Sequence, residues 1–289
     1  MKRRGQLLSA IQTERYENQK GAILEYSWDD EILTEVAVQD CPFGMCTVAE
    51  KLFVCDAKLN RIIIYHAITL EKIDEITSPL FNDIHSIVQV GDTLLVASTG
   101  VDTVLRVSLS DYSTEPIVSF VASDNPNGLA VSSTRLDATV DYSALHISTE
   151  QQVTHLNYAA LLPDNTLGIS LFHQGSLISY KDGEFSFIIK DLYRSHAFFE
   201  YNQNFFIADS GNHCVKVYTL PNYDFVQAIP FDGWVQDIKK IDIDGKSLMF
   251  ASDADNSLIQ VYDLVQNKVI RTIQLPKNYR ISSCELKML

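Results

Sequence analysis

Three histidines and one aspartate open apolar segments of the chain at a repeated position. His155, His196 and Asp237 follow one another at intervals of 41 residues, and His85 opens a similar segment earlier in the chain. Three neutral imidazoles with an open position are a known zinc arrangement, and histidine with carboxylate suits non-haem iron. The pattern predicts a divalent metal, Zn²⁺ or Fe²⁺, bound by the three histidines, with Asp237 as a fourth ligand or catalytic base.

A structural role for these four residues stays open beside the metal. Buried polar side chains need hydrogen-bond partners, so a histidine or aspartate at the start of a segment would also fasten neighbouring segments together. Asp83 in "DIH" and Asn157 in "HLN" are suitable second acceptors for metal-bound rings.

Further candidates lie beside His196 and in the turns of the same repeats. The stretch "YRSH" provides Tyr193, a phenol for acid or base catalysis, and Arg194, a guanidinium for an anion; solvated loop positions are the alternative. The predicted substrate-binding residues are Asn157, His173, Asp209 and His213.

These residues belong to a repeat of short strands. The stretches "LFVCDAKLNRIIIYHA" (52–67), "FFIADSGNHCVKVYTL" (205–220) and "LMFASDADNSLIQVYDL" (248–264) each read as an apolar strand, a polar turn and a second strand. Another apolar segment precedes each copy and a fourth follows it. Four short strands repeated about every 41 residues predict an all-β chain of β-propeller blades.

The ends of the chain complete the circle. Residues 7–28 and 31–38 match the three outer strands of a blade but lack an inner one, and "RISSCELKML" (280–289) has the period of an inner strand. We therefore expect N-terminal strands and a C-terminal inner strand to close the last blade, which removes an open sheet edge.

The expected architecture is one domain, 1–289, with six blades. An irregular gap between His85 and His155 predicts a long loop or partial hairpin at 121–152; seven blades, one degenerate, is the alternative. Inner strands line the channel of a propeller, so side chains at their starts converge. Five of the seven histidines map to one end of the channel, whereas His66 and His146 do not.

The stretch "IADSGNHCVKVY" (207–218) resembles the NHL-repeat and gluconolactonase-like six-bladed propellers. The motifs "DIH", "HLN" and "SH" are also similar to those of an uncharacterised group of bacterial propellers. The resemblance implies the fold over most of the chain. The acidic calcium ligands of the gluconolactonase-like enzymes find no residue-by-residue match here, so their activity is not carried over.

Composition and charge limit the classes of partner and the kinds of cysteine site that this chain could have. A net charge of −14 disfavours nucleic acid and anionic membrane surfaces as partners. Five cysteines without a C-x-x-C pair fit buried free thiols better than disulfides or a cysteine-rich zinc site. With no apolar signal segment or anchor recognised, we expect a cytoplasmic protein.

Two functions remain open from the sequence. The first is an enzyme that binds a small molecule at the channel mouth, a metal-assisted lyase or hydrolase. The second is a non-catalytic propeller that binds a protein or glycan partner.

The metal hypothesis predicts the metal content of purified, untagged protein. Each of His85→Ala, His155→Ala and His196→Ala should sharply lower the zinc or iron found by elemental analysis, because each removes one ligand. His66→Ala is the control and should not. Unchanged metal content in the three variants would instead support the structural role, in which these histidines hold neighbouring segments together.

Overall fold

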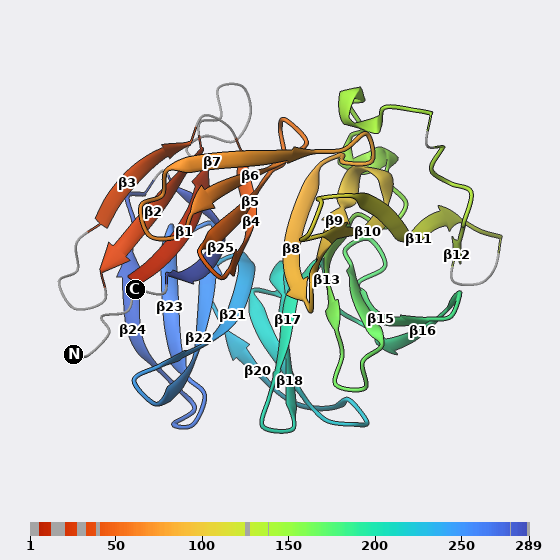
Figure 1. Ribbon diagram of the computed structural model, residues 1–289. Helices are drawn as coiled ribbons and strands as arrows, with labels where there is room; N and C mark the ends of the chain where they lie inside the picture. The colour runs from red at the N-terminus through yellow and green to blue at the C-terminus, as the bar shows by residue number, and fades with distance from the viewer. Residues whose placement is uncertain are drawn as a thin grey trace.

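The computed structural model describes residues 6–12, 21–27, 33–38, 41–124, 128–137, 139–277 and 279–287. Its strands form six antiparallel sheets arranged around a central channel (Figure 1). The predicted all-β, six-bladed propeller is therefore confirmed, and the seven-bladed alternative is wrong. In the described residues no helix is long and apolar enough to cross a membrane.

The blades are numbered by the order of their outer strands along the chain. The strands of each blade are given from the channel outward. Blade 1 consists of β25 (Arg280–Lys287), β1 (Gln6–Gln12), β2 (Gly21–Ser27) and β3 (Leu33–Val38). Blade 2 consists of β4 (Pro42–Val48), β5 (Lys51–Asp56), β6 (Arg61–His66) and β7 (Lys72–Thr77). Blade 3 consists of β8 (Ile84–Val90), β9 (Thr93–Ser98), β10 (Thr103–Ser108), β11 (Thr114–Ala122) and β12 (Leu129–Val131).

The other three blades have four strands each. Blade 4 consists of β13 (Leu156–Leu161), β14 (Leu167–Leu171), β15 (Ser176–Lys181) and β16 (Glu184–Ile189). Blade 5 consists of β17 (Ser195–Tyr201), β18 (Asn204–Asp209), β19 (Cys214–Thr219) and β20 (Asp224–Pro230). Blade 6 consists of β21 (Val235–Ile243), β22 (Lys246–Asp253), β23 (Leu258–Asp263) and β24 (Lys268–Gln274).

Local sequence explains why these segments form hairpins. Strands such as "RIIIYH" are rich in β-branched residues, which pack well on a pleated surface. Asp182 and Gly183 join β15 to β16 and both have positive φ, 51° and 90°. A two-residue turn with positive φ at both positions matches the right-handed twist of its flanking strands.

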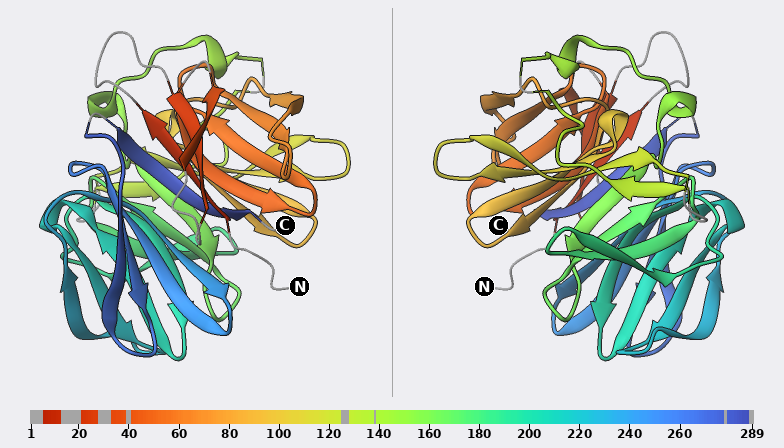
Figure 2. Two further views of the ribbon diagram at one scale, coloured as in Figure 1. Left: turned by 90° about the vertical axis from the view of Figure 1, so that its left-hand side faces the viewer. Right: turned by 90° about the vertical axis from the view of Figure 1, so that its right-hand side faces the viewer.

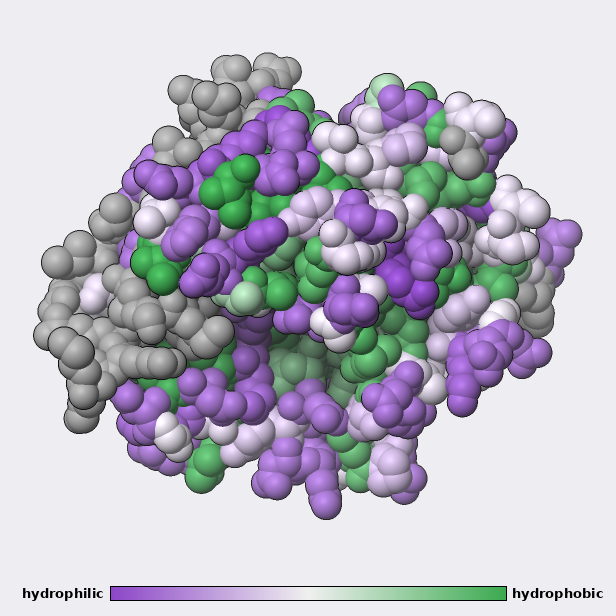
Figure 3. Space-filling model, in the orientation of Figure 1, coloured by the Kyte–Doolittle hydropathy of each residue, from purple (hydrophilic) through white to green (hydrophobic). Residues whose placement is uncertain are grey.

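The hydrophobic core lies mainly between blades. Phe53 of β5 packs with Phe81 and with residues of β8 and β9, which joins blade 2 to blade 3. Phe250 of β22 packs with residues of β2 and β25, which joins blade 6 to blade 1. Polar side chains cover most of the described surface in the view of Figure 3, and apolar ones form small separate groups.

The terminal strands close the ring as predicted. Strand β25, dark blue, lies against the red N-terminal strand β1, and the two pair in antiparallel register with Leu8 opposite Glu285 (Figure 2). Two side chains of β21 hold β25 from the other side. The Asp237 carboxylate accepts hydrogen bonds from the Ser283 hydroxyl and the Cys284 amide, and Lys239 forms an ion pair with Glu285. Residues 288–289 of the predicted closing strand lie outside the described residues.

The segment between β11 and β13 contains a short hairpin and a long connection. Strand β12 pairs with β11, and two single-turn 3₁₀ helices, η2 (Tyr142–Ala144) and η3 (Thr149–Gln151), follow it. The Asn82 amide donates to the carbonyls of Tyr142 and Leu145, which anchors the connection beside blade 3. Residues 125–127 and 138 of the predicted loop lie outside the described residues.

Ring closure predicts a large stability effect at a single apolar residue of β25. Ile281 is fully buried between blades 1 and 6, so Ile281→Ala should lower the free energy of unfolding by about 2–5 kcal/mol. Urea unfolding followed by tryptophan fluorescence would measure it. The control is Val265→Ala, at a turn position with 72% exposure, which should change stability by less than about 0.5 kcal/mol. Equal effects of the two substitutions would contradict this account of ring closure.

Candidate functional site

Every inner strand carries an extra residue near its start, and this β-bulge determines what faces the channel. In β8 the pairing with β9 passes from Ile84↔Ser98 to Ser86↔Ala97, which leaves His85 unpaired. Corresponding register shifts occur in the inner strands of the other five blades. A bulge bends its strand and re-aims a side chain. The bulged segments place six side chains around the channel: Phe43, His85, Asn157, His196, Gln236 and Ser282.

The structure corrects the predicted equivalence of His85, His155, His196 and Asp237. His85 and His196 are at bulges, but His155 precedes β13 and has a positive φ of 46°. Asp237 follows the bulge of β21 and pairs with Ser252. A slip of one residue changes the face of a strand on which a side chain lies. Asn157 and Gln236 hold the bulge positions of β13 and β21, so equal spacing placed His155 two residues too early and Asp237 one residue too late.

His85 uses both ring nitrogens in hydrogen bonds to oxygen atoms. Nδ1 lies 2.9 Å from Oδ1 of Asn157, and Nε2 lies 3.0 Å from the Asp83 carboxylate. The Asn157 amide is oriented by its own donation to the Ser195 carbonyl, so both His85 nitrogens act as donors. Burial alone would lower the pKa of His85, but the Asp83 charge and these hydrogen bonds outweigh it and raise the pKa. The contacts of both nitrogens therefore favour the protonated form of the His85 ring.

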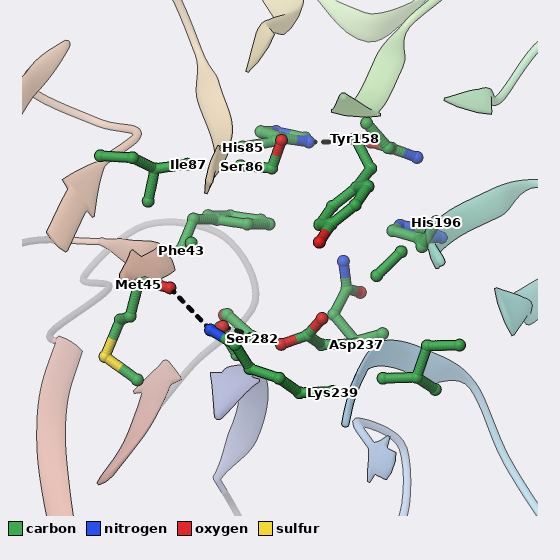
Figure 4. A pocket seen from close by; sticks show the side chains of 16 residues that line it. Phe43, Met45, His85, Ser86, Ile87, Tyr158, His196, Asp237, Lys239 and Ser282 are labelled. Carbon is green, nitrogen blue, oxygen red and sulfur yellow. Dashed lines mark hydrogen bonds between the residues drawn. The ribbon is translucent and has the colours of Figure 1, made fainter. Parts of the chain in front are cut away.

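The ring of Phe43 stacks on His85 with centroids 4.3 Å apart. An aromatic face attracts a cation through its quadrupole, which is consistent with a protonated His85. Figure 4 shows both rings at the same cavity, with His196, Tyr158 and Asp237 pointing into it from other blades.

His155 and His196 are neutral rings. Burial, followed by the nearby charge of His85, lowers the pKa of His155 to about 2 and that of His196 to about 3. Their side chains bond to protein through Nδ1: His155 contacts Oε1 of Gln152, and His196 contacts the Ser210 hydroxyl. Because the Ser210 hydroxyl donates to the Val235 carbonyl, Nδ1 of His196 carries the proton. Each ring is left with an unprotonated Nε2.

Asp102 fixes the backbone that carries His155. This carboxylate is fully buried and accepts hydrogen bonds from the amides of Val153, Thr154 and His155. Arg135 pairs with it from the connecting segment. The positive φ of His155 is thus held by blade 3 rather than by its own strand.

Two depressions meet at this end of the channel, above a narrow inner cavity. One has a volume of about 860 Å³ and the other about 750 Å³, and they share lining residues that include Phe43, His85 and His155. The inner cavity, about 40 Å³, is large enough for a few water molecules. The mouth could therefore accept a small molecule, while the channel below it could not.

The structure brings six of the ten predicted site residues to the larger depression or its rim. His85, His155, His173, Tyr193, Arg194 and His196 line it. Asn157 lies at the bulge below, and Asp237 lies deeper, in the inner cavity. Burial raises the pKa of Asp237 against the opposing charge of Lys239.

Asp209 and His213 line neither depression. Asp209 is fully buried, where it accepts a hydrogen bond from the Tyr193 amide and pairs with Lys216. His213 ends a 3₁₀ turn, η4 (Ser210–Asn212), and is exposed. His146, expected away from the mouth, lines the smaller depression instead, because the connection after β12 folds back over blade 3.

The three predicted metal ligands are not grouped around one point. The rings of His85 and His155 lie 5.0 Å apart, and Phe172 contacts both His155 and His196. Within the described ranges no three His, Cys, Asp or Glu side chains are arranged to hold one ion. An ion at His85 would also have to displace Asp83 or Asn157. The metal site stays a prediction, with elemental analysis as its test.

Sequence reasoning missed the aromatic wall of the larger depression. Trp234 lies directly before β21, and Phe172 lies in the turn after β14. The Trp234 ring is 5.5 Å from that of His196 and 6.3 Å from that of Phe172. The position of Trp234 in the repeat could have identified it, because Trp234 directly precedes its inner strand, as Arg194 and His155 precede theirs.

Comparisons with known proteins identify the fold and no family. No family model matches the chain, and no curated protein matches its sequence. A chain of the nidogen/laminin complex is 12% identical with a TM-score of 0.69, and the match covers 98% of each chain. Proteins provisionally named 6-phosphogluconolactonases are also similar. The one from Bacteroides fragilis is 10% identical over 98% of both chains, with a TM-score of 0.63. The one from Bacteroides uniformis is 12% identical over 99% of this chain and 100% of that one, with a TM-score of 0.61.

The neutral state of His196 predicts a pH dependence of stability. Its folded pKa, about 3, lies below the unfolded value of about 6.5, so between these values the unfolded state binds the proton and the native state does not. The contribution of the neutral His196 ring to the free energy of unfolding is therefore complete above pH 6.5. It is lost as the pH falls, by up to about 1.4 kcal/mol per pH unit. His196→Gln should reduce the loss of stability between pH 6.5 and 5 in urea unfolding.

His66→Gln is the matched control, because His66 ends β6 in blade 2 and lines neither depression. It should retain the acid sensitivity of the wild type. If His196→Gln also retained it, the ring would be protonated in the folded protein and the assigned tautomer would be wrong.

Proposed function

We propose that the chain binds a small molecule at the mouth of its channel and hydrolyses a lactone. The observation that carries this proposal is the pair of neutral rings, His155 and His196, whose Nδ1 atoms are used by the protein and whose Nε2 atoms remain unprotonated. Both rings line a depression of about 860 Å³, large enough for a sugar-sized ligand.

Lactone opening needs one proton to be moved twice. Water adds to the carbonyl carbon, the ring carbon–oxygen bond breaks, and a hydroxy acid is released. An imidazole Nε2 would accept the proton of the attacking water and return it to the leaving oxygen. A ring with a pKa of about 3 is a weak base in the empty site, but the negative tetrahedral intermediate beside it would raise that pKa as the reaction proceeds.

The names of two similar structures support a lactone as the substrate type. Both Bacteroides proteins are provisionally named for action on 6-phosphogluconolactone. At 10–12% identity the likeness extends to the fold alone, so the substrate type is our inference for this chain. The aromatic wall of Phe172 and Trp234 adds to it, since aromatic faces provide apolar contact area in ligand pockets.

A second candidate is a non-catalytic module that binds a protein. The observation in its favour is the likeness to a chain of the nidogen/laminin complex, which has a higher TM-score than the two Bacteroides proteins. In that case the mouth would show no turnover of any lactone.

The lactonase proposal predicts opening of glucono-1,5-lactone faster than its spontaneous hydrolysis, measured in a pH-stat. His155→Gln and His196→Gln should lower kcat/KM by about 10²- to 10⁴-fold, the usual contribution of a general base. His66→Gln should retain activity. Turnover lost with a chelator and restored by Zn²⁺ would instead support the metal-assisted route, and a rate equal to the spontaneous one would favour the binding module.

A further inference from the structure

Arg194 lies at the mouth with its guanidinium group over three aromatic rings. The guanidinium carbon is 5.2 Å from the ring centroid of Tyr193, 5.5 Å from that of Phe172 and 5.9 Å from that of Trp234. The planar guanidinium stacks well on such faces. The rings hold one side of the group and leave its N–H donors to the depression, which Arg194 lines.

Arg194 differs from several other arginines in its electrostatic partner. Arg61, Arg106 and Arg135 each pair with a carboxylate, those of Glu75, Glu115 and Asp102 respectively. Among the described residues no carboxylate lies within ion-pair distance of the Arg194 guanidinium. The guanidinium group contacts the faces of Tyr193, Phe172 and Trp234, which attract the charge but do not neutralise it.

The backbone holds this arginine in an unfavourable conformation. Arg194 has a φ of 57°, which a residue with a long side chain rarely adopts. Its carbonyl accepts a hydrogen bond from Nδ1 of His196, and the preceding Tyr193 is fixed through its amide by Asp209 and through its carbonyl by Gly211. Gly211 lacks the Cβ that would collide with the Tyr193 ring. Asp83 and His155 have positive φ at the same position, directly before β8 and β13, so this conformation belongs to the connections that lead into inner strands.

The larger depression is lined by more basic than acidic side chains, although the whole protein is acidic. The chain carries a net charge of −14, yet Arg194 and Arg280 line the larger depression. The Asp83 carboxylate nearby is neutralised by His85, which leaves Glu150 as the acidic side chain of the lining. A local positive site in a cleft concentrates anions there.

We propose that Arg194 binds an oxyanion, a carboxylate or a phosphate, carried by the small molecule that enters the mouth. The guanidinium presents parallel N–H donors that match two oxygens of such a group. The proposal rests on the proposed function for the location of the ligand, and it specifies the ligand class as anionic. Asp209 and Gly211 then act as positioning residues for the Tyr193–Arg194 pair.

Isothermal titration with glucose, gluconate and glucose 6-phosphate at low salt tests the proposal. We expect wild-type protein to bind at least one of the two anions about tenfold or more tightly than glucose, and the difference to shrink in 0.5 M salt through screening. Gluconate and glucose 6-phosphate distinguish a carboxylate from a phosphate. Arg194→Gln should reduce the preference to about twofold or less, and Arg194→Lys should retain part of it, because a lysine keeps the charge without the planar fork.

Lys190→Gln is the matched control, since it removes one positive charge from the same connection between β16 and β17 but outside both depressions. It should leave the anion preference within about twofold of the wild type, as expected for a screened distant charge. Equal binding of the anions and glucose, no binding of either anion, or a preference that persists in Arg194→Gln would overturn the proposal. Absence of lactone turnover with anion binding intact would overturn only the lactonase function.

Discussion

The closed circle of six inner strands is the constraint on which the mouth depends. Side chains from blades far apart in sequence meet there only because β25 completes the ring between β21 and β4. Asp237 and Lys239 of β21 hold this last strand through Ser283, Cys284 and Glu285. Glu285 raises the pKa of Lys239 against the effect of burial. Removing one partner of this partly buried pair would leave the other charge poorly solvated, so the charged part of the channel serves closure.

The bulge near the start of each inner strand separates two layers of the channel. Bulged residues such as His85 and His196 face the mouth, whereas the residues that follow, including Tyr158 and Asp237, line the narrow cavity below. Burial raises the pKa of both Tyr158 and Asp237, which keeps their acidic protons bound more tightly than in water. The lower layer encloses only about 40 Å³, so the space for a small molecule lies in the upper layer.

Two imidazoles 5.0 Å apart have opposite protonation preferences. Asp83 and Asn157 raise the pKa of His85 and favour its cationic form, whereas burial and then the charge of His85 lower the pKa of His155. Gln152 contacts His155 and also contributes to the lowered pKa of Asp83, so the two rings share one network. Titratable groups whose environments push their pKa values apart are a frequent basis for assigning acid and base roles. Here they provide a fixed positive charge beside a neutral acceptor.

Local signals in the sequence predicted the strands, the closure of the ring and six blades as the preferred count, because apolar alternation and polar turns recur in every blade. It also selected residues that the mouth contains, such as His196 and Arg194. The register of side chains around the channel was decided only in three dimensions. His155 lies two residues before the bulge position of β13 and Asp237 lies one residue after that of β21, so equal spacing along the chain did not give equal positions around the channel. The burial of Asp209, the approach of His146 and the aromatic wall around Arg194 also depend on contacts between separate blades and loops. Such contacts leave no periodic signal in the chain.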